Sequence, residues 1–141
     1  MENTRIYKLG IIGFGGMAGH HFTQLSKGNT RVRIKGIYAL LEERREAARE
    51  KGLYVYSSSE EIFADPEIDI VLVAATNEVH KELCIRALRA GKHVLCEKPV
   101  TLSSADLEEV MAVAKEVGKV FTIDQNRRVN RDYVLMRRTI D

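Results

Sequence analysis

Three small residues lie at a spacing that suits phosphate binding: Gly13, Gly15 and Ala18 in the stretch "GIIGFGGMAGHH". In the G-x-G-x-x-G/A pattern, the first glycine permits a tight turn and the second lets the backbone approach a pyrophosphate. The third small residue lets a helix pack closely on a strand. A helix that begins near Gly16 would offer free N–H groups and the positive end of its dipole to the phosphates. The pattern follows a strand-like run and precedes a helical one, which favours a dinucleotide site over a glycine-rich turn without a ligand.

The second recognition point of such a site is usually an acid at the end of the second strand, which binds the ribose hydroxyls. In "GIYALLEERR" Ala39 takes that place, and Glu42 and Glu43 follow where a helix already begins. Arg44 and Arg45 could approach a 2′-phosphate, although a solvated helix face is the favoured interpretation of both. The sequence therefore leaves the choice between NAD and NADP open.

Lys98, in the stretch "VLCEKPV", is the residue with the clearest capacity for acid–base chemistry. A lysine beside the positive ring of an oxidised nicotinamide, partly removed from water, should have a lowered pKa. Its amine could then take or give a hydroxyl proton while hydride moves. Pro99 would fix the backbone so that the lysine points into the cleft, and the bond before it can be cis at modest cost. The alternative is a strand-to-turn transition that carries an exposed ion pair.

His80, in "TNEVHKE", is a weaker candidate. Asn77 is expected to be the N-cap of a helix, which would place His80 in the first turn, at the ligand edge. Both a role at the site and an ordinary packing role stay open for it. His20 and His21 lie on the first predicted helix, and the sequence assigns neither a role.

Polar and basic residues follow the last predicted strand in "DQNRRVNR", namely Gln125, Asn126, Arg127, Arg128 and Arg131. They could contact an anionic or polyol substrate or the nicotinamide end of the coenzyme, or they could form a basic link to the next element. Aromatic residues that could stack on bases are not interleaved with them, which argues against nucleic-acid binding.

Strand-length apolar runs alternate with helical patterns along the chain, which predicts parallel βαβ units. Strands are expected at about 7–12, 32–39, 53–56, 69–74, 93–96 and 120–123. Helices are expected at about 17–27, 42–51, 59 onward, 79–90, 104–117 and from about 130. Glycines at 28, 52, 91 and 118, with Asn29, are expected to end helices, and Ser58 and Ser103 to begin them.

The fold class is therefore α/β: an open, doubly wound parallel sheet of the Rossmann type, in which ligands sit beyond the carboxyl ends of the strands. Three segments converge on that edge: "GFGGMAG", "AATNEVH" and "CEKP".

Composition narrows the class of protein. With 141 residues the chain is long enough for one core, and its net charge of +2 is too small to indicate nucleic-acid binding. Cys84 and Cys96 follow no metal or disulfide spacing and are expected to be reduced, packed thiols. The N-terminus lacks the pattern of a signal peptide, and no apolar stretch approaches the roughly 20 residues that span a bilayer. A cytoplasmic protein that binds neither membrane nor metal is expected.

The quoted motifs together resemble the glucose–fructose oxidoreductase, inositol dehydrogenase and MocA family (Gfo/Idh/MocA). The resemblance rests on "GIIGFGGMAGHH", on "VAATNEVHKELCIRALRAGKHVLCEKPVTLSSADLEEV" and on "TIDQNRR". It implies an NAD(P)-dependent oxidoreductase acting on CH–OH groups of sugars, cyclitols and related small molecules. It also implies a cis Lys98–Pro99 bond and a catalytic, coenzyme-binding role for Lys98. Ala39 departs from the family's frequent strand-end acid.

The resemblance also predicts how the chain is divided. Residues 1–125 are expected to form the dinucleotide-binding domain, and 126–141 to begin the link to a substrate domain that this chain lacks. In the family that second domain forms the substrate wall and the oligomer interface, so the chain alone is expected to turn over little, and the full-length form to be a homo-oligomer. The alternative is a stand-alone, non-catalytic dinucleotide module or redox sensor. The coenzyme is expected to contact Gly13, Phe14, Gly15, Gly16, Met17, Ala18, Ala39, Ala75, Thr76, Asn77, His80, Glu97, Lys98, Pro99 and Asn126.

Overall fold

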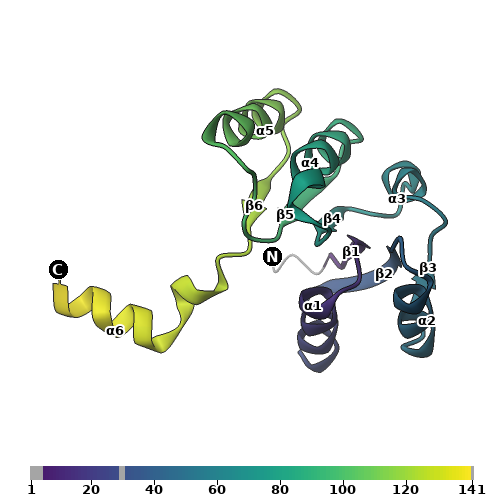
Figure 1. Cartoon of the computed structure of the whole chain (residues 1–141), viewed down its shortest axis with the longest axis horizontal. Coiled ribbons are helices and arrows are strands. Elements are labelled where there is room, and N and C mark those ends of the chain that lie inside the picture. The colour runs from purple at the N-terminus through teal and green to yellow at the C-terminus, as the bar shows by residue number, and fades with distance from the viewer. Residues whose placement is uncertain (1–4, 29–30, 141) are drawn as a thin grey trace.

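A single parallel sheet of six strands forms the centre of the molecule (Figure 1). The computed structural model describes residues 5–28 and 31–140. The strands lie in the order β3-β2-β1-β4-β5-β6, so β2 and β3 lie on one side of β1, and β4, β5 and β6 lie on the other. This order is that of the doubly wound Rossmann fold, and it confirms the fold class expected from the alternation of elements.

The elements follow the predicted sequence of strands and helices closely. The strands are β1 (Tyr7–Ile12), β2 (Val32–Tyr38), β3 (Tyr54–Val55), β4 (Ile70–Val73), β5 (His93–Cys96) and β6 (Phe121–Ile123). The α-helices are α1 (Gly16–Lys27), α2 (Glu42–Glu50), α3 (Ser59–Ala64), α4 (His80–Arg89), α5 (Ser104–Glu116) and α6 (Arg131–Ile140). Short 3₁₀ helices precede α4 (η1, Asn77–Val79) and α6 (η2, Asn126–Val129).

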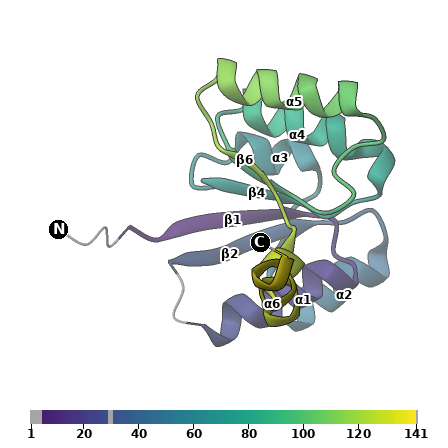
Figure 2. The same ribbon diagram turned by 90° about the vertical axis from the view of Figure 1, so that its left-hand side faces the viewer.

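Helices cover both faces of the sheet, which is why the central strands are apolar throughout. Figure 2 shows α3, α4 and α5 on one side and α1 and α2 on the other. Neighbouring residues of a strand point to opposite faces, so Ile12 joins the core under α3–α5 while Ile11 joins the core under α1 and α2. In β4, Val71 and Val73 face the first core and Leu72 faces the second, and all three are fully buried.

Most helix ends match the local signals in the sequence. Gly52, Gly91 and Gly118 have positive φ angles after α2, α4 and α5, as expected of residues that stop a helix. The Ser58 hydroxyl accepts a hydrogen bond from the Glu61 N–H at 3.3 Å, and the Ser103 hydroxyl accepts one from the Asp106 N–H at 3.2 Å. These bonds are the N-caps that the two serine motifs predicted.

Two expected caps are wrong. Gly28 has φ of −96° and ψ of 151°, so α1 ends in extended backbone and not in the left-handed turn that glycine was expected to supply. Asn29, expected to share that role, lies outside the described residues. Asn77 is not an N-cap either, because Thr76 precedes the 3₁₀ turn and Asn77 already belongs to it.

The last helix, α6, extends away from the sheet, as Figure 1 shows. None of its described residues is buried, and its apolar side chains Leu135, Met136 and Ile140 are more than half exposed. Within the described residues, every helix is too short or too polar to span a lipid bilayer. Cys84 and Cys96 are both buried and not disulfide-bonded, as their positions predicted.

Candidate functional site

The turn between β1 and α1 is built so that only glycine fits its first position. Gly13 has a φ of +90°, and a Cβ there would lie 2.3 Å from the carbonyl oxygen of Ala74. The Gly13 N–H donates to Tyr38 O at 2.8 Å, which fixes the turn to the end of β2. The neighbouring strand thus approaches too closely for any side chain, which is the physical reason for the first glycine of the motif.

The start of α1 presents open backbone. A Cβ at Gly15 or Gly16 would meet nothing within 4 Å, and Gly15 makes no side-chain cap bond because it has no side chain. The first turn of α1 contains no acidic residue, so no side-chain carboxylate there competes with an anion for its N–H groups. Ala18 is 1 % exposed and packs in the same core cluster as Ile11, as expected of the third small residue. Phe14 is buried too, in the same core cluster.

A pocket of about 490 Å³ opens beside this turn. It is lined by Ile12, Gly13, Phe14, Gly15, Tyr38, Ala39, Leu40, Leu41, Arg44, Ala74, Ala75, Thr76, Val79, Glu82, Leu83 and Arg86. The lining comes from the carboxyl ends of β1, β2 and β4, which is the crevice where an open parallel sheet binds ligands. Its size lies within the range of about 300–1,000 Å³ typical of small-molecule sites.

Arg44 and Arg45, either of which could approach a 2′-phosphate according to the sequence, have different surroundings at the end of β2. Arg45 donates from Nε to the carbonyl oxygen of Ala39 at 2.6 Å and lies 5.9 Å from the centre of the Tyr38 ring, so its guanidinium supports the strand end. Arg44 instead lines the pocket and has an exposed side chain, 3.4 Å from Glu43 at its nearest ion-pair contact. Ala39 is buried at the pocket wall and offers no carboxylate.

His80 does not line the pocket beside Gly13, and its contact with a coenzyme stays a prediction. Its side chain is fully buried, with Nδ1 3.0 Å from Pro99 O and Nε2 3.1 Å from Ala75 O. It therefore links the loop after β4 to the turn after β5. Burial lowers the pKa of the imidazole, but contacts with Cys96 and the two carbonyl groups raise it by more, so the pKa of His80 lies above its ordinary value.

Lys98 and Pro99 are exposed at the carboxyl end of β5, and the bond between them is cis, as the family resemblance implied. The Glu97 N–H donates to Val73 O at 2.9 Å, which fixes the start of this turn against β4. β4 pairs in parallel with β1 on one side and with β5 on the other, so the carboxyl ends of all three strands lie at one edge of the sheet. The Gly13 turn and the turn that carries Lys98 are therefore on the same edge. The remaining expected contacts, Met17, Thr76 and Asn77, also lie in loops or first helical turns at that edge.

Asn126 and its neighbours line a second pocket. A pocket of about 650 Å³ is lined by residues of α5 and β6 together with Gln125, Asn126 and Arg128. Asn126 does not line the pocket beside Gly13, so its contact with a coenzyme stays a prediction.

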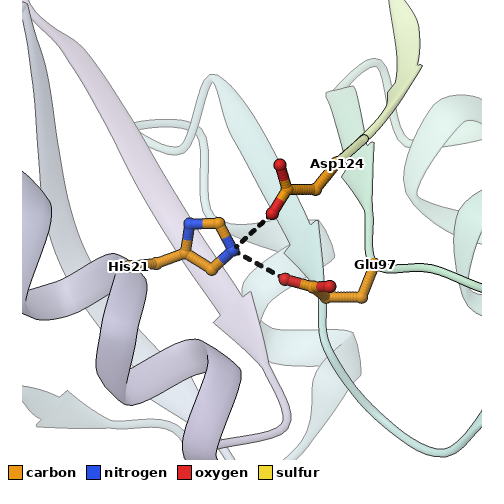
Figure 3. A group of neighbouring side chains, drawn as sticks. All are labelled: His21, Glu97 and Asp124. Atoms are coloured by element: carbon orange, nitrogen blue, oxygen red, sulfur yellow. Dashed lines mark hydrogen bonds and ion pairs between the residues drawn. The ribbon is translucent and has the colours of Figure 1, made fainter. Parts of the chain in front are cut away.

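Figure 3 shows a cluster that the sequence did not predict, made of His21, Glu97 and Asp124. Glu97 directly precedes Lys98 in the sequence. His21 Nε2, on α1, is 2.7 Å from Glu97 Oε1 and 3.3 Å from Asp124 Oδ2. Within the described part of the chain this is the one group of at least three His, Cys, Asp or Glu side chains whose ligand atoms lie within 4.8 Å of one another. Its members are far apart in the sequence, and the helical position of His21 carried no signal of its own.

Comparison with known proteins shows the family of the chain. Residues 7–125 match the Gfo/Idh/MocA oxidoreductase family, NAD-binding Rossmann fold. The chain belongs to this family. It is therefore an NAD(P)-binding Rossmann domain of Gfo/Idh/MocA oxidoreductases, as the motifs at Gly13 and Lys98 indicated.

Similar proteins include two inositol dehydrogenases. The chain is 29% identical to inositol 2-dehydrogenase of Salmonella typhimurium over 138 residues, and 30% identical to myo-inositol 2-dehydrogenase of Thermotoga maritima over 139 residues. Each alignment covers 95% of this chain, and the chain spans only 41% and 40% of the two relatives.

Two solved structures have the same fold. One is an NAD-binding protein from Listeria innocua, 46% identical, with a TM-score of 0.92 over 96% of this chain and 40% of that one. The other is biliverdin reductase from Synechocystis in complex with biliverdin and NADP+, 28% identical, with a TM-score of 0.84 over 94% of this chain and 42% of that one.

Proposed function

We propose that this protein serves hydride transfer between a nicotinamide coenzyme and the carbinol carbon of a cyclitol, sugar or related polyol. The observation that carries the proposal is the placement of two turns on one edge of the sheet. The phosphate-binding turn at Gly13 follows β1, and the turn with Lys98 follows β5, with β4 between them. A dinucleotide whose pyrophosphate lies at the start of α1 would extend its nicotinamide toward the ends of β4 and β5.

Each part of the site has a separate task in this proposal. The N–H groups of Gly15 and Gly16 bind the pyrophosphate, and the pocket at Ala39 takes the adenosine end. A bound coenzyme supplies the hydride acceptor. Lys98 is the catalytic residue, and its amine takes the hydroxyl proton as the C–H hydride leaves a polyol, or returns the proton in the reverse reaction. The cyclitol or sugar substrate is suggested by the inositol dehydrogenases among the relatives.

The rest of the substrate site is proposed to come from a second domain, because the chain spans about 40% of the relatives' length. The full-length protein is then expected to be a homo-oligomer, with its interface on that domain. The 141-residue chain alone should bind coenzyme and turn over little.

Coenzyme titration tests the binding step. NADH and NADPH are titrated into the chain and followed by nucleotide fluorescence, with Gly15→Glu as the control, because its carboxylate would occupy the open space at the pyrophosphate position. Saturable binding that Gly15→Glu abolishes supports the proposal. Failure of both coenzymes to bind folded protein contradicts it.

A turnover assay tests whether catalysis requires a second domain and Lys98. The chain alone, and a protein in which it is joined to the second domain of the Thermotoga maritima relative, are assayed with NAD and NADP over inositols and sugars. Turnover by the fusion that Lys98→Met removes supports the catalytic assignment. Rapid turnover by the chain alone contradicts the need for a second domain. A fusion that binds coenzyme but reduces none with any substrate favours the non-catalytic module instead.

A further inference from the structure

The cluster of His21, Glu97 and Asp124 joins three elements that are distant in the sequence. His21 lies on α1, Glu97 directly follows β5, and Asp124 directly follows β6. Figure 3 shows the imidazole reaching from the helix to both carboxylates, which approach the same ring nitrogen. The side chains retain 18 %, 7 % and 16 % of their accessible surface, so the contact is largely shielded from water.

The contacts of His21 with Glu97 and Asp124, here called the clasp, have the geometry of hydrogen bonds and not of a metal site. Nε2 lies 2.7 Å from Glu97 Oε1, an ordinary distance for a charge-assisted hydrogen bond. Two ligands of a tetrahedral ion with bonds of about 2.0 Å would lie roughly 3.3 Å apart. An ion would therefore have to push His21 and Glu97 apart, whereas a shared proton needs no movement.

The backbone around the clasp is already fixed on one side. The Glu97 N–H donates to Val73 O, and the Asp124 N–H donates to Cys96 O, each at 2.9 Å. These bonds fix the strand ends but leave the direction of the Glu97 side chain, and of the exposed turn that follows it, to side-chain contacts. His21 supplies such a contact from the opposite half of the sheet, and His80 supplies another through Pro99 O.

We propose that His21 is a positioning residue: by holding the carboxylates of Glu97 and Asp124 it fixes the turn that presents Lys98 to the coenzyme. This inference rests on the proposed coenzyme-binding function. It adds that the helix whose N-terminus binds the pyrophosphate also sets, one turn later, the direction of the lysine at the nicotinamide end. The two ends of the coenzyme site are then linked through α1.

Hydrogen exchange of the coenzyme-free protein tests the clasp without reference to binding. His21→Ala removes the imidazole, and His20→Ala is the matched control, since His20 is the exposed neighbour on the same helix. Amide exchange in segments 97–101 and 124–126 should accelerate about threefold or more in His21→Ala only. His21→Gln, which keeps a side-chain N–H, should restore part of the protection. Equal exchange in His21→Ala and wild type contradicts the proposal.

A double-mutant cycle then tests whether His21 acts through Lys98. Dissociation constants for NADH and NADPH are measured for wild type, His21→Ala, Lys98→Ala and the double variant. His21→Ala should weaken binding roughly fivefold when Lys98 is present and less than twofold when it is absent. A loss of the same size in both backgrounds contradicts the proposal, because it would show that His21 acts without Lys98.

Two further outcomes are separable. If wild type binds neither coenzyme, the proposed function fails, while the exchange data still decide whether the clasp holds the turn. If wild type binds stoichiometric Zn²⁺ or Mn²⁺ in calorimetry, and His21→Ala does not, the positioning role is replaced by a metal site.

Discussion

The imidazole of His80 lies between the carbonyl oxygens of Ala75 and Pro99, at 3.1 Å and 3.0 Å from its two ring nitrogens. A neutral imidazole can donate to only one carbonyl oxygen, and the other then faces a nitrogen lone pair. A protonated imidazole donates to both. His80 is therefore a fully buried link between two loops of the candidate site, and its protonation affects how well the link is made.

His80 should make stability depend on pH in a defined direction. Its pKa is raised in the folded protein, so its contribution is fully present below about pH 6.5, its unfolded value, and is lost as pH rises through the folded pKa. Urea unfolding at pH 5.5 and pH 8.5 should show wild type losing more stability with rising pH than His80→Gln does. The exposed His20→Gln should behave as wild type, and equal pH dependence of His80→Gln and wild type would count against the assignment.

Gly13 and Gly15 should separate folding from binding. Gly13→Ala combines a φ of +90° with a 2.3 Å clash against Ala74 O, and should destabilise the protein by about 3 kcal/mol. Gly15→Ala places a methyl group in open space and should leave unfolding by urea within about 0.5 kcal/mol of wild type. It should nevertheless weaken coenzyme binding tenfold or so, because the methyl group lies where the pyrophosphate approaches. Unchanged affinity in Gly15→Ala would place the phosphates elsewhere.

Coenzyme preference should depend on the end of β2. With Ala39 in the usual acid position and Arg44 at the pocket, we expect NADPH to bind more tightly than NADH. Ala39→Asp should reverse the preference by repelling the 2′-phosphate and binding the ribose hydroxyls. Arg44→Ala should weaken NADPH about tenfold and leave NADH unchanged. Arg49→Ala, on the same helix but outside the pocket, is the control, and an equal loss for both coenzymes in Arg44→Ala would refute the assignment.

Asp65 should control acid stability from a region away from the site. Partial burial raises the pKa of this carboxyl, but bonds from Lys35 and Tyr56 lower it by more, to about 2. Its contribution is present above about pH 3.8, its unfolded value, and is lost as pH falls toward 2. Asp65→Asn should cost about 1–3 kcal/mol at pH 7, and little at pH 2, in urea unfolding followed by circular dichroism. Coenzyme affinity at pH 7 should be unchanged.

Local sequence determined the elements and the edge where ligands bind. Alternating apolar runs, the glycines after α2, α4 and α5, and the serines before α3 and α5 act within a few residues, so their outcome could be predicted. The requirement for glycine at position 13 was predicted in the same way, since the motif implies its own turn. The caps at Gly28 and Asn77 were wrong: Gly28 adopts extended backbone, and the 3₁₀ turn already begins at Asn77, after Thr76.

Tertiary structure decided what each polar side chain at that edge does. Periodicity places His80 in a first helical turn but does not show that its ring is buried between two loops. It places Arg44 and Arg45 side by side, yet only packing directs Arg45 to Ala39 O and leaves Arg44 at the pocket. His21 and Glu97 are 76 residues apart, and they meet because the strand order brings the end of β5 beside α1. Contacts of this kind depend on the assembled sheet, and no short stretch of the sequence encodes them.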